Sequence, residues 1–230
     1  MDILGKALKD FYEGRKNQPT LLIHNHYGDP DFMDPAIYFR NPQEMPKVEL
    51  FAMSLCEGRI LDVGAGVGAH VLHLQKQGLD ITAVELSEVA CKIMKKRGVT
   101  KIINKDFFEI KEGGFDMIFC MMNGIGFAGT IEGLKYTLDH ARKLLVPGGM
   151  ILFDSSDVSY LYPKGRLKAQ PYFGELDYCY QYGDTWGNWF KWLYIDHRKM
   201  AEISREMGWH LQILYQDQTG HFLGGMKLSG

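Results

Sequence analysis

The chain has 230 residues, of which 46% are hydrophobic and 23% charged, and its formal net charge at pH 7 is −2. This length and apolar content can supply the core of one large α/β domain. The nearly balanced charge argues against a protein that binds nucleic acid or anionic lipid through its overall charge.

The cysteines and the N-terminal residues are typical of a protein that is not exported. Cys56, Cys91, Cys120 and Cys179 form no CxxC pair and lie mostly among apolar neighbours, as reduced core cysteines do. The stretch MDILGKALKDFYEGRK carries charges throughout, and the longest apolar run, near residues 117–129, is broken by glycine and too short to span a bilayer. We therefore expect a cytoplasmic protein without a membrane anchor.

The N-terminal part of the chain is expected to be mainly helical. Apolar residues at helical spacing predict an amphipathic helix over residues 3–12, and a loop with several prolines is expected over residues 19–35. A second helix can begin at Pro42, which follows an asparagine, or at Pro46, and it is expected to end at Gly58.

From residue 59 onward, apolar strands and amphipathic helices alternate. Short apolar runs predict five strands, over residues 59–63, 80–85, 101–106, 115–123 and 150–156. Helical spacing predicts helices over residues 67–78, 87–98 and 134–145, the second of them capped by Ser87 and Gly98. Repeated β–α units imply a mostly parallel sheet with helices on both faces.

The C-terminal residues predict a different ending for the sheet. Helical spacing continues over residues 200–207, and residues 209–228 predict two strands joined by a turn at Thr219 and Gly220. The sheet is therefore expected to finish in an antiparallel hairpin.

The stretch ILDVGAGVGAH, residues 60–70, places three glycines directly after the first predicted strand of the core. A ligand that binds at the carboxyl end of such a strand must pass close to the main chain, where a Cβ at Gly64 or Gly66 would obstruct it. A tight turn with no ligand is the alternative. The pattern D-x-G-x-G-x-G, which begins at Asp62, differs from the G-x-G-x-x-G of dinucleotide sites.

Carboxylates also stand at the ends of the next two predicted strands. Glu85 can accept two hydrogen bonds from the hydroxyls of a ribose, although it could instead be an exposed charge at a strand end. Asp106 is placed to meet the exocyclic amine of a base, or it could simply cap a helix. Three acceptors at successive strand ends, with no Lys or Arg in the glycine turn, predict a nucleoside ligand that carries positive charge rather than phosphates.

The stretches ILDVGAGVGAH, AVELS, KDFFEI, FDMIFCMMNGIG and ARKLLVPGGMILFD resemble, in this order, the successive motifs of class I S-adenosylmethionine-dependent methyltransferases. The resemblance covers about residues 58–155. It implies an α/β, Rossmann-like fold with a mostly parallel seven-stranded sheet, S-adenosyl-L-methionine as cofactor and S-adenosyl-L-homocysteine as product. The glycine turn by itself would also allow a nicotinamide-dependent oxidoreductase.

The resemblance also implies which residues contact the cofactor. The methionine moiety would lie along the glycine turn, the ribose at the end of the second strand, the adenine at the third, and the sulfonium near the end of the fourth, where the family's acceptor binds. The implied set is Asp62, Gly64, Ala65, Gly66, Glu85, Leu86, Asp106, Phe107, Met121, Met122 and Asn123.

Aromatic residues concentrate after the core: ten of the 23 residues from Tyr172 to Tyr194 are aromatic. Their alternation predicts two strands around the turn GDTWG, each with an aromatic face. The faces could merely pack an extra hairpin on the core. Alternatively, Tyr180 and Trp192 could line an acceptor pocket and hold an amine or a methylated ammonium through cation–π attraction.

Other acceptor-side candidates lie in the N-terminal segment and after the fifth strand. The stretch HNHYGDPD, residues 24–31, could be a polar loop or a metal site, but no metal is predicted. Because N-terminal segments often close over the active site in the resembled family, His26, Tyr27 and Tyr38 could face the substrate, and Tyr160 is a comparable candidate.

Asn123 begins the stretch NGIG at the end of the fourth strand. It could orient an acceptor or cap the segment that follows. The stretch lacks the prolines of the Asn/Asp-Pro-Pro-aromatic segment found in methyltransferases that act on planar nitrogens, which argues against DNA adenine or glutamine side chains as acceptors.

Together these features predict one methyltransferase domain over residues 1–230. Its expected parts are an N-terminal helical cap, a cofactor-binding core, an aromatic-rich insertion, and a C-terminal helix with a hairpin, over residues 1–57, 58–155, 156–195 and 196–230. We expect methyl transfer by in-line displacement to a nitrogen or oxygen of a small molecule, with no nucleic-acid partner. A non-catalytic regulatory protein that binds the cofactor, or a protein or RNA methyltransferase, is the alternative.

Overall fold

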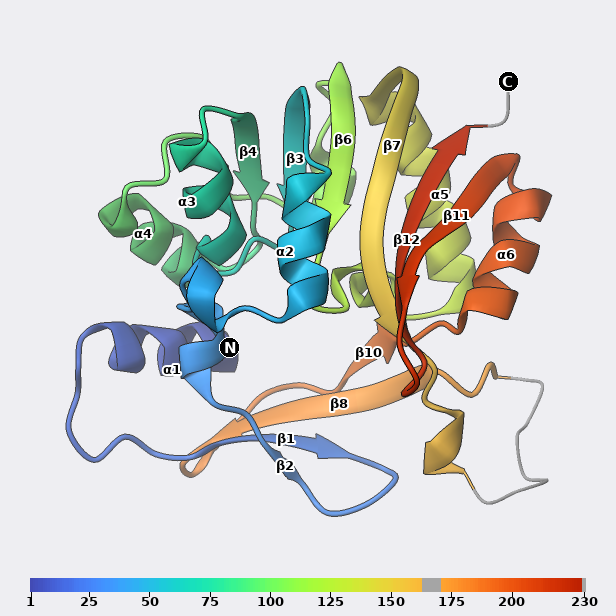
Figure 1. Cartoon of the computed structure of the whole chain (residues 1–230). Coiled ribbons are helices and arrows are strands. Elements are labelled where there is room, and N and C mark those ends of the chain that lie inside the picture. Colours follow the sequence, from blue (N-terminus) through green and yellow to red (C-terminus); the bar gives the residue numbers. More distant parts are fainter. Residues whose placement is uncertain (163–170, 229–230) are drawn as a thin grey trace.

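The computed structural model describes residues 1–162 and 171–228 of the chain. These residues form a seven-stranded sheet and a separate antiparallel sheet of five strands. In Figure 1 the second sheet lies across the end of the molecule toward which the parallel strands point. The carboxyl ends of those strands therefore face a second layer rather than open solvent.

The seven-stranded sheet has the order β11-β12-β7-β6-β3-β4-β5. Its five parallel strands are β3 (Arg59–Val63), β4 (Asp80–Val84), β5 (Ile102–Ile103), β6 (Phe115–Cys120) and β7 (Leu145–Ser156). The C-terminal strands β11 (Trp209–Gln216) and β12 (His221–Leu228) form a hairpin, and β12 runs antiparallel to β7. The predicted mostly parallel sheet with an antiparallel ending is confirmed.

Helices cover both faces of this sheet because alternate strand residues point to opposite sides. Ile60 and Met117 belong to the core that packs against α2 (Lys47–Ser54), α3 (Ala69–Lys76) and α4 (Glu88–Arg97). Their chain neighbours Leu61 and Ile118 belong to the core under α5 (Ile131–Leu144) and α6 (His197–Glu206). Apolar runs without polar alternation, as in β3 and β6, follow from burial on both faces.

The helix caps expected from the sequence are largely as predicted. The Ser87 hydroxyl accepts a hydrogen bond from the Ala90 amide (3.0 Å), and Gly98 closes α4 in the left-handed conformation. Both possible starts of the second helix are used. Pro42 opens a short 3₁₀ turn, η2 (Pro42–Glu44), and Pro46 directly precedes α2, which ends before Leu55 rather than at Gly58.

The predicted loop over residues 19–35 is wrong in part. Residues Leu21–Asn25 form strand β1 and Asp31–Phe32 form the short β2, whereas η1 (Pro35–Tyr38) is a 3₁₀ turn. Strand β1 pairs with β8 (Glu175–Tyr182), about two thirds of the chain away. Five residues are too few to identify a strand by pattern alone, and the hydrogen-bonding partner appears only when the chain is folded.

The aromatic segment forms the rest of the second sheet. Strand β8 pairs with β10 (Phe190–Leu193), and the two-residue β9 (Thr185–Trp186) folds back on the end of β8. The predicted hairpin is therefore confirmed, but it joins the N-terminal strand β1 to make one sheet with the order β10-β8-β1-β2.

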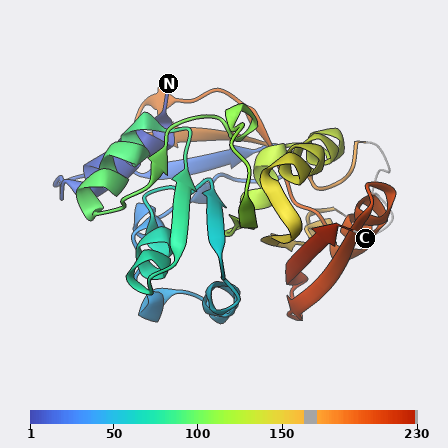
Figure 2. The ribbon, with the colours of Figure 1, turned by 90° about the horizontal axis from the view of Figure 1, so that it is seen from above.

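The remaining elements lie at the two ends of the molecule. Helix α1 (Ile3–Tyr12) packs beside α4, and in Figure 2 this pair forms one end while α6 and the C-terminal hairpin form the other. The third core strand, expected over residues 101–106, is reduced to β5, which pairs only with β4 at the sheet edge. Within the described ranges, the helices are too short or too polar to cross a lipid bilayer.

A glycine at the start of α3 offers a test of its packing against the C-terminal end of α4. Gly68 has φ +82°, and a Cβ there would lie 2.9 Å from Cγ2 of Val99, whereas Gly148 has the same φ and open space around it. We expect Gly148→Ala to lower the free energy of unfolding by about 1–2 kcal/mol through backbone strain alone. Gly68→Ala should cost roughly 1–3 kcal/mol more because of the overlap. Urea unfolding without ligand measures both, and equal losses would contradict the packing described.

Candidate active site

A cavity of about 470 Å³ lies between the carboxyl ends of β3, β4 and β6 and the second sheet. One part of its lining comes from the glycine turn, the end of β4 and the segments around residues 105–108 and 121–124. The other part comes from the N-terminal segment and from β8 and β10. Residues from both sets singled out in the sequence therefore meet in one space.

The glycine turn exposes main-chain atoms, without side chains, to this cavity. Gly64 and Gly66 have φ values of +73° and +55°, and the amides of Gly64 and Ala65 both donate to the Val84 carbonyl (2.9 and 3.2 Å). A Cβ at Gly64 would project into open space, whereas one at Gly66 would lie 3.3 Å from the ring of Tyr38. The turn thus leaves room at Gly64 and is covered by an aromatic ring at Gly66.

Asp62 lies in β3 just before the turn and lines the cavity while being only 3% exposed. Its Oδ2 atom has no hydrogen-bond partner among the described residues. Burial raises the pKa of Asp62 to about 6, against the opposing charge of His70, and the nearby Glu85 raises it further. A buried carboxylate oxygen without a partner is costly, and a cationic ligand group in the cavity would compensate it.

Glu85 follows β4 and faces the same cavity, so it is not an exposed charge at a strand end. Its Oε2 accepts a hydrogen bond from the Gly66 amide (2.9 Å) and its Oε1 from the Ser87 amide (2.8 Å). Burial raises its pKa although these amide donors oppose the shift. The carboxylate therefore fixes the glycine turn against the start of α4.

Asp106 caps a short 3₁₀ helix, η3 (Phe107–Glu109), by accepting a hydrogen bond from the Phe108 amide (2.9 Å). This is the capping role that the sequence left open, and Asp106 lines the cavity as well. Phe107 is buried beside it, whereas Leu86, on the cavity rim, is 71% exposed.

A buried ion network stands behind the glycine turn. Glu49 of α2 accepts from Arg40 (2.8 Å) and is hydrogen-bonded to Nε2 of His70 at the start of α3 (2.9 Å). Burial works to raise the pKa of Glu49, but the bonds and charges of His70 and Arg40 outweigh it and lower the pKa. His70 lines the cavity, and sequence reasoning missed this network because three separate segments supply it.

The second sheet gives the cavity an aromatic wall, defined here as Tyr178, Tyr180, Phe190, Trp192 and Tyr194. Tyr178 and Tyr180 share one face of β8, and Phe190, opposite Tyr178 in the register, shares the corresponding face of β10 with Trp192. The Tyr38 ring, from η1, also lines the cavity. The sequence predicted roles for Tyr38, Tyr180 and Trp192 but not for Ile23 and Met33, which lie in the segment expected to be a loop.

The hydroxyls of the wall remain protonated at neutral pH. Burial, followed by the charge of Glu85, raises the pKa of Tyr38 to about 12, and burial raises the pKa of Tyr180 well above its ordinary value. Burial likewise raises the pKa of Tyr194. These side chains therefore offer neutral rings and hydroxyl donors rather than phenolate bases.

Met121 and Met122 line the cavity beside the end of β6, but the Asn123 side chain points into the protein. Its Nδ2 donates to the Leu193 carbonyl (3.2 Å), and its Oδ1 accepts from the Ser155 hydroxyl (3.0 Å). Both ends of the amide are thus occupied by the protein, and the side chain makes no cap for η4 (Gly124–Ala128). The contacts thus show Asn123 neither orienting an acceptor nor capping the following segment, and of the implied cofactor set it alone is not among the cavity residues.

Three further candidates lie outside the lining of the cavity. His26 stacks on Trp189 with ring centroids 4.2 Å apart, and Tyr27 packs edge-on against Tyr162 at 5.6 Å. Tyr160 is 76% exposed. Across residues 1–162 and 171–228, no cluster of three or more His, Cys, Asp or Glu side chains is arranged to hold a metal ion.

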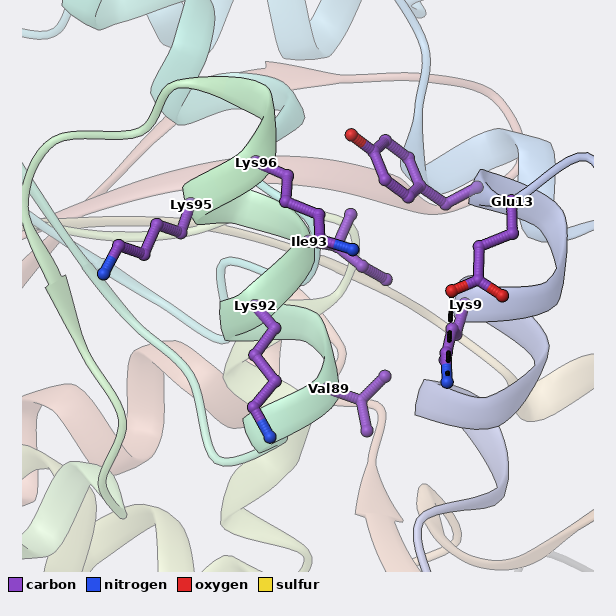
Figure 3. Close-up of a pocket in the computed structure, with 8 residues that line it drawn as sticks. Lys9, Glu13, Val89, Lys92, Ile93, Lys95 and Lys96 are labelled. Carbon is purple, nitrogen blue, oxygen red and sulfur yellow. Dashed lines mark ion pairs between the residues drawn. The ribbon is translucent and has the colours of Figure 1, made fainter.

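A second hollow lies between α1 and α4 and is shown in Figure 3. Its lining includes Lys9, Lys92, Lys95 and Lys96 together with the apolar Val89 and Ile93, and Lys9 pairs with Glu13 at 3.9 Å. This hollow contains none of the residues singled out in the sequence, so the cavity at the glycine turn remains the candidate active site.

The comparisons with known proteins agree on one family. A family model described as a methyltransferase domain matches residues 60–149. The crystal structure of an S-adenosylmethionine-dependent methyltransferase from Bacteroides fragilis, in complex with S-adenosyl-L-homocysteine, is 33% identical, with a TM-score of 0.92, and the match covers 100% of this chain and 95% of that one.

Curated relatives match over shorter stretches. A ubiquinone biosynthesis O-methyltransferase of Bordetella avium (strain 197N) is 24% identical over 55% of this chain and 54% of the relative. A 23S rRNA (uracil(747)-C(5))-methyltransferase of Pyrococcus horikoshii (strain ATCC 700860) is 28% identical over 40% of this chain and 24% of the relative. The chain thus spans about half the length, or less, of the curated relatives it matches.

The match to the Bacteroides fragilis structure extends over nearly all of both chains, so it includes the second sheet as well as the cofactor-binding core. This match excludes the alternative of a nicotinamide-dependent oxidoreductase. This chain belongs to the class I S-adenosylmethionine-dependent methyltransferases, whose cofactor is S-adenosyl-L-methionine.

Proposed function

We propose that this chain transfers a methyl group from S-adenosyl-L-methionine to a nitrogen or oxygen atom of a small-molecule acceptor. The observation that carries the proposal is the single cavity that joins the glycine turn and its carboxylates to the aromatic wall. One end has the charge and space that suit the cofactor, and the other end is an enclosed aromatic surface.

The cofactor end of the cavity fits a nucleoside that carries positive charges. Bound S-adenosyl-L-methionine supplies a methyl group activated by its attachment to a cationic sulfur. Asp62, with its unpartnered Oδ2, would hold the ammonium group beside the main chain of Gly64, Ala65 and Gly66. Glu85 would bind the ribose hydroxyls.

The adenine and the methyl would be held by neighbouring groups. Leu86 and Phe107 would flank the adenine, and Asp106 would accept from its amine. Met121 and Met122 would lie beside the sulfur. In-line displacement mainly requires that the acceptor be aligned and that water be excluded, and such positioning can be worth about 7–11 kcal/mol.

A small acceptor is favoured by what encloses the other end of the cavity. The second sheet lies over the carboxyl ends of the parallel strands, and its aromatic wall turns an open edge into an enclosed space. The names of the matched relatives include both a small-molecule and an rRNA methyltransferase, so likeness in sequence does not choose between these acceptors.

A direct test offers the purified chain methyl-labelled S-adenosyl-L-methionine together with a metabolite mixture, total RNA or a protein extract. We expect release of S-adenosyl-L-homocysteine and transfer of label only with the metabolite mixture. Transfer to RNA or protein would contradict the small-molecule assignment. Tight binding of the cofactor with no release in any mixture would indicate a regulatory protein instead.

Asp62→Asn tests the cofactor end. Loss of the charge should weaken S-adenosyl-L-homocysteine binding by about 10- to 100-fold at neutral pH, the range for a hydrogen bond to a charged group. In the native chain, binding should weaken as the pH falls through about 6, because Asp62 then takes up a proton and loses its charge. Calorimetry across this pH range should show a weaker dependence in the variant. The control Asp139→Asn, exposed on α5, should behave as the native chain.

The same variant makes a separate prediction about stability without ligand. The pKa of Asp62 is higher in the folded chain than its ordinary value of 3.8, so the folded state holds the proton more tightly. Folding stability that involves this group therefore falls as the pH rises from about 4 to 6. Asp62→Asn should be at least as stable as the native chain at neutral pH, and a large loss of stability would contradict the uncompensated burial.

A further inference from the structure

We propose that the acceptor is an amine and that the aromatic wall, together with Tyr38, forms a cage that binds its positively charged form. This inference rests on the proposed methyl transfer. It assigns a chemical class to the acceptor from the shape and charge of the space that would receive it.

The rings of the wall line one cavity and are inclined to one another at different angles. The planes of Phe190 and Trp192 meet at 86°, and those of Tyr178 and Tyr194 at 77°, each pair with centroids 6.3 Å apart. Tyr180 lies at a shallower angle to Phe190, with centroids 5.2 Å apart. Electron-rich ring faces turned in several directions around a cavity are what a compact cation needs, because it is attracted to each face it approaches.

The cage is held in place by backbone rather than by the rings alone. Hydrogen-bonded pairing of β10 with β8 sets Phe190 opposite Tyr178 and Trp192 opposite Leu176. The Trp192 ring packs so closely on η4 that a Cβ at Gly126 would overlap it. Gly126, the second glycine of the stretch NGIG, thus permits this contact. The rings are therefore in position before a ligand binds.

The cavity lining includes the cation Lys105 as well as Asp62, Glu85 and Asp106. The charged side chains that raise the pKa values of the wall hydroxyls and of Tyr38 are carboxylates. After burial, which is the main effect, Glu85 raises the pKa of Tyr38; burial and Tyr194, and then Asp31, raise the pKa of Tyr178. Asp154 and Asp31 contribute in the same direction at Tyr194. Carboxylates around neutral rings create a potential that favours a cation, in addition to the attraction of the ring faces.

Methylation of an amine keeps a positive charge in this space. The ammonium first releases a proton to water, and the nitrogen lone pair then forms the bond to the methyl carbon. The bond between that carbon and the sulfur breaks with its electrons left on sulfur, so positive charge moves from sulfur to nitrogen. Ring faces beside the nitrogen would stabilise this charge as it develops.

Choline and 3,3-dimethylbutan-1-ol are suitable probes because they have nearly the same shape and differ in charge. Calorimetry would measure their binding to the native chain saturated with S-adenosyl-L-homocysteine. We expect choline to bind at least about tenfold more tightly than the neutral alcohol, as desolvated cation–π contacts allow. Equal binding of the two probes, or no binding of choline, would overturn the amine assignment.

Variants at two tryptophans locate the effect. Trp192→Leu should remove most of the preference for choline, and Trp192→Phe, which keeps a ring face, should retain part of it. The matched control is Trp186→Leu: Trp186 is 51% exposed, packs on His24 and is not among the cavity residues. It should leave both affinities unchanged. The cage is wrong if Trp186→Leu removes the preference or Trp192→Leu preserves it.

Binding of S-adenosyl-L-homocysteine separates this inference from the proposed function. A native chain that folds but does not bind S-adenosyl-L-homocysteine refutes the methyl transfer and the cage with it. A chain that binds S-adenosyl-L-homocysteine but does not discriminate between the probes refutes only the amine. Each variant should retain the native affinity for S-adenosyl-L-homocysteine, which also shows that it is folded.

Discussion

The candidate site depends on one constraint, the burial of the Asp62 carboxylate next to the glycine turn. Asp62 is almost fully buried and one of its oxygens is unpartnered, which ordinarily costs a protein stability. His70, in its protonated form, offsets part of that cost, and its ring is held by Glu49, which also pairs with Arg40. The N-terminal segment therefore supports the glycine turn electrostatically as well as by packing.

The second sheet turns the edge of a common fold into an enclosed site. Parallel strands leave their carboxyl ends at one edge, where ligands of open α/β sheets bind. Here β1 and β8, far apart in the chain, pair across that edge and bring aromatic residues over it. The shape of the cavity at the aromatic wall therefore depends on pairing between the N-terminal segment and the aromatic segment.

A buried polar network ties the two sheets together beside the cavity. Asp154 of β7 accepts a hydrogen bond from the backbone amide of Asn123 (2.9 Å). It is also hydrogen-bonded to Nε2 of His221 (2.8 Å), and this bond raises the pKa of that histidine. The Ser155 hydroxyl donates to Asn123 and accepts from the Ile195 amide, just after β10. Asn123 thus serves the alignment of the two sheets, and Met121 and Met122 before it are left to face the cavity.

The sequence by itself determined the features that depend on neighbours along the chain. Alternating apolar runs and helix caps such as Ser87 and Gly98 act locally, so the β–α order and the turn at Gly64 and Gly66 could be predicted. The ordered motifs also placed Asp62 and Glu85 at strand ends.

Only the tertiary structure decided which distant segments meet. Strand β1 is short, and its sequence has no pattern that distinguishes it from a loop. Its pairing with β8 contributes stability only after the long intervening segment is closed, so the pairing cannot be predicted from local sequence. The same holds for the contact of Arg40 and His70 with Glu49, and for the inward direction of the Asn123 side chain. The sequence thus determined the end of the cavity at the glycine turn, whereas long-range pairing decided the end at the aromatic wall, because hydrogen bonds between distant strands leave no periodic signal in either strand alone.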